Sequence, residues 1–346
     1  MTDPRLSSFR RFQTRERKTL RVSQESLVAS GALEPDLEPF PLVIRPNAEG
    51  VDLLSWAEAS REAVSRQLVE HGAILFRDFP GITAERFRGF AGTVCPELLD
   101  YKERAAPRHQ VGSQVYTSTE FPADQAIPLH HEMSYSHNWP RKILFYCDQP
   151  PAERGRTPIA DDRQVIRRLD PEVQREFRSK QVLYVRNYGE GVDLSWQEAF
   201  QTDDRGEVED YCRRAHMDVE WRDGDRLRTR AVRKVLATHP ETGETVWFNH
   251  AHMFHESNLE PAVREALLEE FAPDELPRNA FFGDGSPIPD GVLDHIRSTY
   301  EETAVRFTWQ RGDVLLVDNI LASHGREPYG GERRILVAMG ELHDNL

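Results

Sequence analysis

The order of apolar and polar residues predicts two helices followed by a long series of short strands. Apolar residues recur at helical spacing over residues 55–70, the run 73–76 is typical of a buried strand, and Thr83 is placed to cap a second helix. Further helices fit residues 261–271 and 292–302. The remaining apolar runs predict strands at residues 143–147, 155–160, 181–186, 226–233, 246–249, 304–309, 313–318 and 333–339, with a loop at 101–127.

This pattern predicts a mainly β protein with flanking helices, built on a jelly-roll or cupin-like double sheet. No repeat or change in composition marks a second domain, so residues 36–346 are predicted to form one domain. Residues 1–35 begin with a basic stretch and are predicted to form a partly disordered arm, which is either solvated or docks to an acidic partner. A dinucleotide-binding fold fits poorly, because Gly189 and Gly191 lack the third glycine and the following helix of its motif.

Composition narrows the choice of partners. Acidic residues outnumber basic ones 58 to 44, and the net charge of −14 argues against nucleic acid and anionic membranes as partners. No apolar run approaches the roughly 20 residues that cross a bilayer. Cys95, Cys147 and Cys212 form no closely spaced pair, which favours buried thiols in a reducing cytoplasm over disulfides. The 13 histidines leave metal chemistry open.

Candidate chemistry centres on the stretch from Pro128 to Tyr135, where His130 and Glu132 stand two positions apart. On a strand, residues at this spacing point to the same face, so an imidazole and a carboxylate can reach one ion while His131 points away. The zinc-protease motif HExxH does not fit, because Tyr135 stands where its second histidine is required.

A third ligand is predicted near the C-terminus. The apolar strand at 313–318 leads to His324, which precedes the Gly330-Gly331 turn and a second apolar strand. Two histidines and one carboxylate on one face of an octahedron are associated with non-haem Fe(II) oxygenases, whose open positions can take an α-keto acid and O2. Arg334 lies about one strand later, and its planar guanidinium suits the far carboxylate of a dicarboxylate such as 2-oxoglutarate.

Four blocks of sequence carry a family resemblance that covers most of residues 70–342. They are residues 72–77 (GAILFR), 130–135 (HHEMSY), 155–161 (GRTPIAD) and 324–339. On these blocks the chain resembles the taurine dioxygenase-like Fe(II)/2-oxoglutarate oxygenases, and in particular the branch that includes syringomycin-type aspartyl hydroxylases. The resemblance implies a double-stranded β-helix core and an enzyme that uses Fe(II), 2-oxoglutarate and O2.

The resemblance also implies roles for individual residues. By analogy with the family, His130, Glu132 and His324 would bind Fe(II). Thr157 would join Arg334 in holding the C5 carboxylate of 2-oxoglutarate.

Two departures from the taurine-type pattern bear on the substrate. Glu132 replaces the usual aspartate, as in members that act on amino acids, and Ala338 replaces a second arginine that binds the sulfonate of taurine. The resemblance therefore implies hydroxylation of an sp3 carbon in an amino acid, either free or tethered to a peptidyl carrier protein, in specialised metabolism. Desaturation and epoxidation with the same cofactors stay open as alternatives.

Several neighbouring residues are candidates for substrate contacts. Met133 and Tyr135 adjoin the predicted metal site, and Asn249 and His250 follow a strand that should end near the cavity. Arg326 either orients His324 and contacts the substrate or caps the turn.

Other sites and functions also stay open. A rival cupin-like metal site can be drawn at His250 and His252, with His255 and Glu256 nearby. The protein could instead be a metal-dependent cupin hydrolase or isomerase that needs no keto acid, or a non-catalytic jelly-roll binding protein. The intact set of three predicted ligands disfavours the last alternative.

Overall fold

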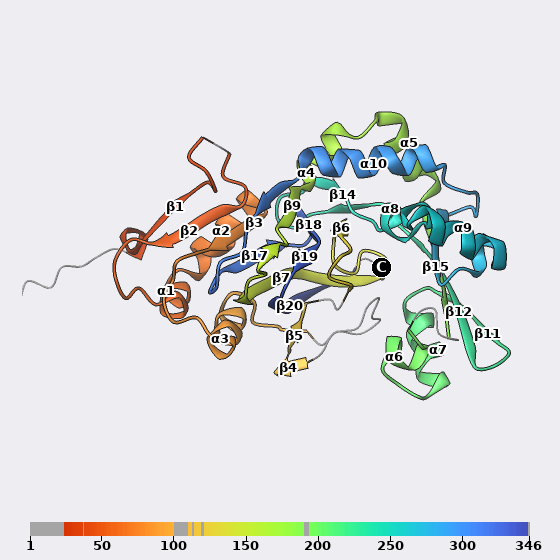
Figure 1. Cartoon of the computed structure of the whole chain (residues 1–346), viewed down its shortest axis with the longest axis horizontal. Helices are drawn as coiled ribbons and strands as arrows, with labels where there is room; N and C mark the ends of the chain where they lie inside the picture. Colours follow the sequence, from red (N-terminus) through yellow and green to blue (C-terminus); the bar gives the residue numbers. More distant parts are fainter. Residues whose placement is uncertain are drawn as a thin grey trace, which may run out of the picture.

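The computed structural model describes residues 24–36, 38–99, 110–112, 114–118, 121–189 and 194–344, and two facing sheets form its centre (Figure 1). Neighbouring strands of the larger sheet are antiparallel, except that β2 and β3 are parallel. This eight-stranded sheet has the spatial order β1 (Val28–Gly31), β2 (Leu42–Pro46), β3 (Ala73–Phe76), β17 (Val314–Asp318), β7 (Asn138–Gln149), β20 (Arg334–Asp344), β5 (Val115–Thr117) and β4 (Gln110–Gly112).

The smaller sheet has four strands, in the order β16 (Val305–Phe307), β9 (Thr157–Asp161), β18 (Ala322–Arg326) and β6 (Ile127–His130). Residues of both sheets meet in one core, to which the larger sheet contributes Leu315 and Val337 and the smaller sheet contributes Leu129 and Ile159. The two layers form a double-stranded β-helix, or jelly roll, so the predicted fold class is confirmed.

Three N-terminal helices cover the other face of the larger sheet. These are α1 (Leu53–Ala59), α2 (Arg61–His71) and α3 (Ala84–Val94), and they share a second core with residues such as Phe76 and Leu316. The single helix predicted at residues 55–70 is two helices, because the chain breaks at Ser60, which ends α1 and begins α2. Thr83 caps α3, as the sequence predicts.

A third sheet lies at the opposite end of the molecule from α1–α3 (Figure 1). Its order is β11 (Asp218–Arg222), β12 (Arg226–Arg233), β10 (Val182–Tyr188) and β15 (Arg278–Phe282). A third core, formed around Trp196 and Leu227, joins this sheet to α6 (Trp196–Phe200) and α7 (Arg205–Arg214). The helix α8 (Ala251–Phe254) packs against β10 and β15, between the third sheet and the jelly roll.

The remaining elements connect these layers. The helix α10 (Asp290–Thr303) packs against α4 (Asp162–Arg168) and α8. The others are α5 (Pro171–Lys180), α9 (Pro261–Glu270), the 3-10 turns η2 (Glu256–Asn258) and η3 (Pro273–Glu275), and the strand pairs β13 (Leu236–Thr238) with β14 (Thr245–Trp247) and β8 (Glu153–Arg154) with β19 (Tyr329–Gly330).

Two predicted boundaries are wrong. The arm predicted for residues 1–35 does not include residues 24–31, because these form η1 (Gln24–Leu27) and β1, and β1 pairs with β2 along its whole length. The segment 101–127, predicted to be loop, contains β4 and β5. The rest of these two predictions falls on residues 1–23, 101–109, 113, 119 and 120, which lie outside the described residues. In the described part of the chain, no helix has the length and apolar character that a membrane crossing requires.

Candidate metal and co-substrate site

The pairing of two strands brings the two predicted histidine ligands together. β6 and β18 are antiparallel neighbours, and His130 and His324 are direct partners in their register, almost two hundred positions apart in the sequence. The centroids of their rings lie 4.6 Å apart. Gly325 permits this close approach of the strands, because a Cβ there would lie 2.7 Å from the carbonyl oxygen of Ile127.

Glu132 comes from a turn, which corrects the expectation that it shares a strand with His130. β6 ends at His130, and the chain then turns, with Met133 in the left-handed backbone region (φ 60°). Asn319, directly after β17, fixes the turn: its Oδ1 accepts a hydrogen bond from the Glu132 N–H (2.8 Å), and its Nδ2 donates to the Glu132 carbonyl (2.9 Å). Asn319 is not among the residues predicted from the sequence, where its one signal is its place at the polar end of a buried strand.

His130, Glu132 and His324 converge on one point. Their potential ligand atoms all lie within 4.8 Å of one another. His130 Nδ1 lies 2.8 Å from the carbonyl oxygen of Pro128, and because a carbonyl only accepts hydrogen bonds, Nδ1 carries the proton and Nε2 presents its lone pair. That tautomer is the one a metal ligand needs, and the set of two imidazoles and one carboxylate suits a non-haem Fe(II) ion.

His131 stands between the ligands in sequence but packs into the core. Its Nε2 lies 3.2 Å from Asp162 Oδ2, and both side chains are fully buried. Its ring packs 4.5 Å from the ring of Phe248, between centroids. The Asp162 carboxyl also contacts the hydroxyls of Ser323 and Tyr300, and burial raises the pKa of Asp162. This buried polar cluster anchors the ligand-bearing segment through a residue that is not a ligand itself.

One cavity extends from the histidine pair into the jelly roll. Thr157 lines it and is buried, and its Oγ1 accepts a hydrogen bond from Trp309 Nε1 at 2.8 Å. Because the indole N–H is the donor in that bond, the Thr157 hydroxyl can direct its own proton to an acceptor in the cavity, such as a carboxylate oxygen. The lining includes His130, Phe145, Thr157, His324, Arg326 and Arg333.

The arginine in this cavity is Arg333 rather than Arg334. Arg334 is exposed and pairs with Asp148 at 3.2 Å, so the expectation that its guanidinium enters the cavity is wrong. Arg333 Nη1 donates to Ser118 Oγ at 3.3 Å, and its buried Nε has no hydrogen-bond partner among the described residues. Burial and the neighbouring Arg326 lower the pKa of Arg333 to about 10, so the group stays charged at neutral pH. A half-buried guanidinium next to a second cation is suited to bind an anion.

Arg333 enters the cavity and Arg334 does not because only one face of β20 and of the residue before it meets the cavity. Ile335 and Val337 join the core between the two sheets, whereas Leu336 packs in the core beneath the N-terminal helices. Successive strand residues point to opposite faces, so Arg333 shares the inward face of Ile335. The pairing of β20 with β7 also shifts register between Arg334 and Ile335, where one step along β20 stands opposite two steps along β7.

Tyr135, His250 and Met133 lie next to the metal cluster. The ring of His250 is 5.6 Å from that of His130 and 5.1 Å from that of Tyr135, between centroids. Its Nδ1 is hydrogen-bonded to the Ser134 hydroxyl, and burial lowers the pKa of His250 well below its usual value, so the ring is neutral. Met133 is buried in the core between the sheets.

The side chains of Asn249 and Arg326 form their hydrogen bonds mainly with backbone groups. Asn249 Nδ2 donates to the Val235 carbonyl, and its Oδ1 accepts from the Ala251 N–H. The Arg326 guanidinium donates to the carbonyl oxygens of residues 121, 122 and 125. Arg326 therefore fixes this segment at the edge of the cavity.

The rival histidines do not converge on a metal. His252 Nε2 is hydrogen-bonded to the Leu129 carbonyl, and burial lowers the pKa of His252 to about 3. His255 contacts Ser257 and Glu256 instead of the other two histidines. Within the part of the chain that the structure describes, His130, Glu132 and His324 are the one group of three or more residues with metal-binding geometry.

A jelly roll that holds two histidines and a carboxylate beside a half-buried arginine and a buried threonine is typical of the non-haem metal oxygenases. The comparison with protein families identifies the group within this class. Residues 36–339 match the model described as "Taurine catabolism dioxygenase TauD, TfdA family", and the chain belongs to that family. The protein is therefore a non-haem dioxygenase that uses Fe(II), 2-oxoglutarate and O2, as the sequence analysis predicted.

Two relatives extend this result. The chain is 45% identical to the dapdiamide synthesis protein DdaC of Enterobacter agglomerans over 280 residues, which cover 81% of this chain and 85% of DdaC. It is 32% identical to a clavaminate synthase-like protein of Arabidopsis thaliana over 321 residues, or 87% and 94% of the two chains.

Solved structures confirm the fold. PvcB of Pseudomonas aeruginosa superposes with a TM-score of 0.56 at 16% identity, covering 94% of this chain and 96% of PvcB. A taurine dioxygenase from Burkholderia xenovorans gives 0.52 at 16% identity, covering 91% and 89%.

Proposed function

We propose that the protein hydroxylates an sp3 carbon of an amino-acid-like substrate, either free or carried as an aminoacyl group on a carrier protein. The observation that supports this most directly is the convergence of His130, Glu132 and His324 at one end of a cavity that also contains Thr157 and Arg333. The relatives fit the proposal, since one is named for dapdiamide synthesis and the other for likeness to clavaminate synthase, which suggests a role in specialised metabolism.

His130, Glu132 and His324 would hold Fe(II) by one face and leave the remaining positions to the keto acid and O2. With these bound, the metal supplies the oxidising power: substrate, O2 and 2-oxoglutarate give hydroxylated substrate, succinate and CO2. The protein's own residues bind and orient the reactants. Asn319 fixes the backbone of Glu132, and the bond from His130 to Pro128 fixes that ring's tautomer.

Thr157 and Arg333 would hold the far carboxylate of 2-oxoglutarate. Arg333 takes the role predicted for Arg334, because Arg333 lines the cavity and Arg334 does not. The Thr157 hydroxyl can donate to the same carboxylate, since Trp309 already donates to its oxygen. A metal cupin enzyme without a keto acid would have no use for this cation and donor.

The test is anaerobic titration of the protein with Fe(II) and 2-oxoglutarate. Chelation of the metal by the keto acid should produce a weak visible charge-transfer band, and Glu132→Ala and His324→Ala should each abolish the band and succinate formation. An undiminished band in both variants would show that the ion binds elsewhere. Succinate release measured with free amino acids and with carrier-bound aminoacyl groups then decides between the two forms of substrate.

A further inference from the structure

Two arginines stand directly opposite each other in the third sheet. Arg186 of β10 and Arg278 of β15 are partners in the antiparallel register, so their side chains lie on the same face of the sheet. Arg186 is only 3% exposed. The guanidiniums of the two arginines therefore present two planar sets of hydrogen-bond donors on one face, an arrangement that suits the oxygens of an anionic group.

The two guanidiniums lie against one pair of stacked aromatic rings. The Arg186 guanidinium is 5.8 Å from the ring centre of Tyr135, and the Arg278 guanidinium is 5.4 Å from that of Phe254. The rings of Tyr135 and Phe254 stack on each other with centroids 5.1 Å apart. The Arg186 guanidinium also lies 4.7 Å from the ring centre of Tyr188, so each arginine makes at least one cation–π contact and the stacked rings lie against both.

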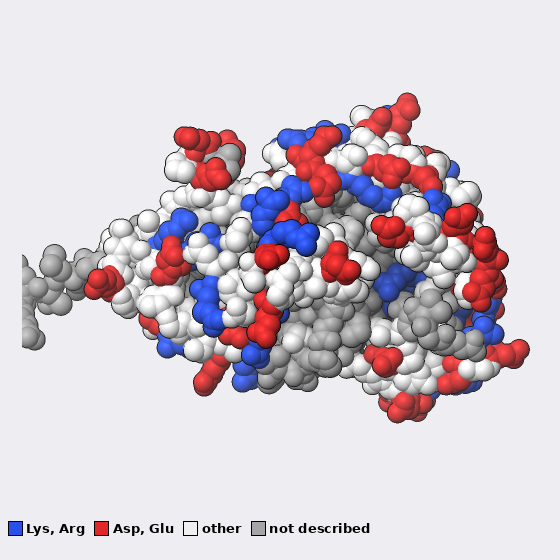
Figure 2. Space-filling model, viewed as in Figure 1, with Lys and Arg blue, Asp and Glu red and all other residues white. Residues whose placement is uncertain are grey.

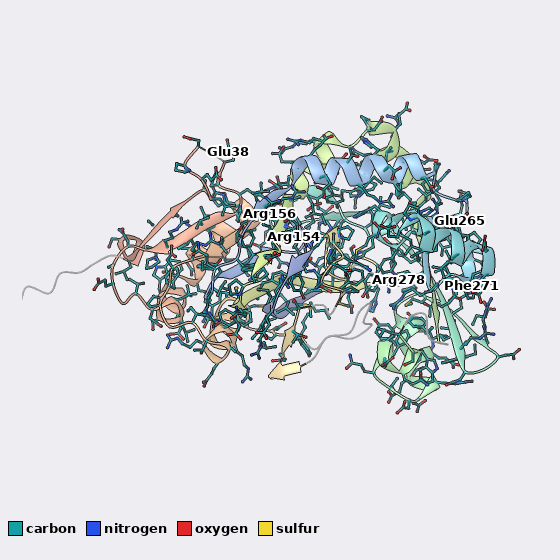
Figure 3. All side chains as sticks on the ribbon, in the orientation of Figure 1. Glu38, Arg154, Arg156, Glu265, Phe271 and Arg278 are labelled. Carbon is teal, nitrogen blue, oxygen red and sulfur yellow. The ribbon has the colours of Figure 1, made fainter. Side chains whose placement is uncertain are left out.

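The stacked rings connect the arginine pair to the metal ligands. The ring of His250 meets Tyr135 and Phe254 edge-on, at 5.1 Å from each, and lies 5.6 Å from the ring of His130. Figure 3 labels Arg278 to the right of the centre of the molecule, and at this place Figure 2 shows basic atoms in a recess. An aromatic and imidazole wall therefore runs from the two cations to the predicted iron site.

This wall is separate from the co-substrate cavity. Arg333, Thr157 and Phe145 line that cavity, whereas neither Arg186 nor Arg278 does. The two groups share only the metal ligand His130, which lines the cavity and contacts His250. The arginine pair is thus available to a molecule other than 2-oxoglutarate.

We propose that Arg186 and Arg278 bind an oxyanion of the substrate, while Tyr135, Phe254 and His250 support the part of the molecule between that oxyanion and the carbon to be oxidised. Two planar guanidiniums can grip such a group with parallel charge-assisted hydrogen bonds. The proposal rests on the proposed function and specifies its substrate: an acid whose anionic group lies several bonds from the oxidised carbon. A free carboxylate and the phosphate of a carrier's pantetheine arm share this chemistry.

The experiment uses the full-length protein loaded anaerobically with Fe(II) and 2-oxoglutarate. The probes are free L-amino acids, their primary amides, pantetheine 4′-phosphate and pantetheine, and binding is measured by the change each causes in the charge-transfer band. We expect at least one anionic probe to bind more tightly than its neutral counterpart. Preference for an amino acid over its amide indicates a free carboxylate, and preference for the phosphate over pantetheine indicates a carrier arm.

The variants separate this role from a structural one. Arg278→Gln should lower the affinity for the preferred anionic probe about tenfold or more and leave the affinity for its neutral counterpart unchanged. Arg278→Lys should recover part of the lost affinity. Arg186→Gln, if that variant folds, should cause the same loss of affinity as Arg278→Gln. The matched control is Arg230→Gln in the same sheet, because Arg230 opposes Val185 and so lies on the other face.

Each result bears on one proposal. Equal affinity for charged and neutral probes in the wild type, no response to any anionic probe, or an unchanged preference in Arg278→Gln would overturn the oxyanion site. Loss of the charge-transfer band in the wild type would instead count against the iron and 2-oxoglutarate assignment.

Discussion

Asn319 commits its side-chain amide to the backbone around the predicted ligand Glu132 and to the Pro140 carbonyl. Asn319→Ala would leave the buried N–H and carbonyl of Glu132 without these partners, so the carboxylate would lose its fixed direction. Loss of such a supporting contact typically costs about 10–100-fold in metal affinity, and we expect a fall of that size in Fe(II) affinity. Titration of the charge-transfer band with Fe(II) measures it.

The control is Asn279→Ala, which also removes a buried amide bonded to the backbone, at Glu256 and Pro273. It should lower the free energy of unfolding without changing Fe(II) affinity. If both variants bound Fe(II) as the wild type does, Asn319 would be a purely structural residue.

Arg333 and its neighbour Arg334 form a natural pair for mutation. Arg333→Gln removes a half-buried cation from the cavity and should weaken 2-oxoglutarate binding by about 2 kcal/mol or more, the usual loss when an interior charged pair loses one member. Arg334→Gln removes an exposed charge paired with Asp148 and should leave that affinity unchanged. Equilibrium titration of the anaerobic Fe(II) protein with 2-oxoglutarate compares the two. The opposite ranking would return the co-substrate role to Arg334.

Arg333 also shows which part of the candidate site the sequence does not predict. The sequence predicts the ligand types and an arginine after His324, but it does not show which of the two neighbouring arginines lines the cavity. β20 is buried on both faces, between the two cores, so residues 335–339 are continuously apolar and give no alternation that marks the inward face. The register shift after Arg334 is likewise invisible in the sequence, because it arises from pairing with a strand that lies far away in the chain.

At the scale of elements, a buried ion pair links Arg77, directly after β3, to Asp313, directly before β17. The Arg77 guanidinium donates to both carboxylate oxygens of Asp313, at 3.0 and 2.6 Å, and also to the Thr308 carbonyl. Arg77→Ala would leave the Asp313 carboxylate buried without its cation, and we expect the free energy of unfolding to fall by about 3–5 kcal/mol. Urea unfolding measures this.

Arg45→Ala is the matched control. Arg45 pairs with Asp78 on the surface, where both side chains are more than a third exposed, so its loss should cost about 1 kcal/mol or less. Equal losses in the two variants would mean that the buried pair contributes no more than an exposed one.

The element predictions succeed where local pattern decides. The buried strand 73–76, the cap at Thr83 and the strand 226–233 follow from spacing and capping alone, and all three are present. β18 was not predicted, because its residues Ala322–Arg326 mix small and polar side chains and lack strand periodicity. Pairing with β6 and β9 makes this segment a strand, and such long-range pairing cannot be read from a short stretch of sequence.

At the scale of the whole molecule, the proposed active centre lies where the three sheets approach one another. The smaller sheet supplies His130 and His324, the larger sheet leads into Asn319, and the third sheet supplies Arg186 and Arg278. The jelly roll thus holds the metal and co-substrate residues, while the third sheet holds the residues proposed for the substrate. Changes in the third sheet can therefore alter substrate choice without altering the binding of iron.

Because the three predicted ligands come from β6, the turn after it and β18, Fe(II) should stabilise the folded chain as a whole. In the unfolded chain, His130 and His324 rarely meet, because almost two hundred positions separate them. The metal therefore binds mainly the native state. At an Fe(II) concentration about 100-fold above its dissociation constant, the free energy of unfolding should rise by about 2.7 kcal/mol. Anaerobic thermal unfolding with and without Fe(II) measures the rise, and a chelator should reverse it.

The variants divide this stabilisation between metal and co-substrate. His324→Ala should abolish the rise caused by Fe(II), whereas Arg333→Gln should keep it and lose most of the further rise caused by 2-oxoglutarate. Arg334→Gln should keep both, because its guanidinium lies outside the cavity. If His324→Ala gained as much stability from Fe(II) as the wild type, the ion would bind elsewhere, and the convergence of β6 and β18 would need another explanation.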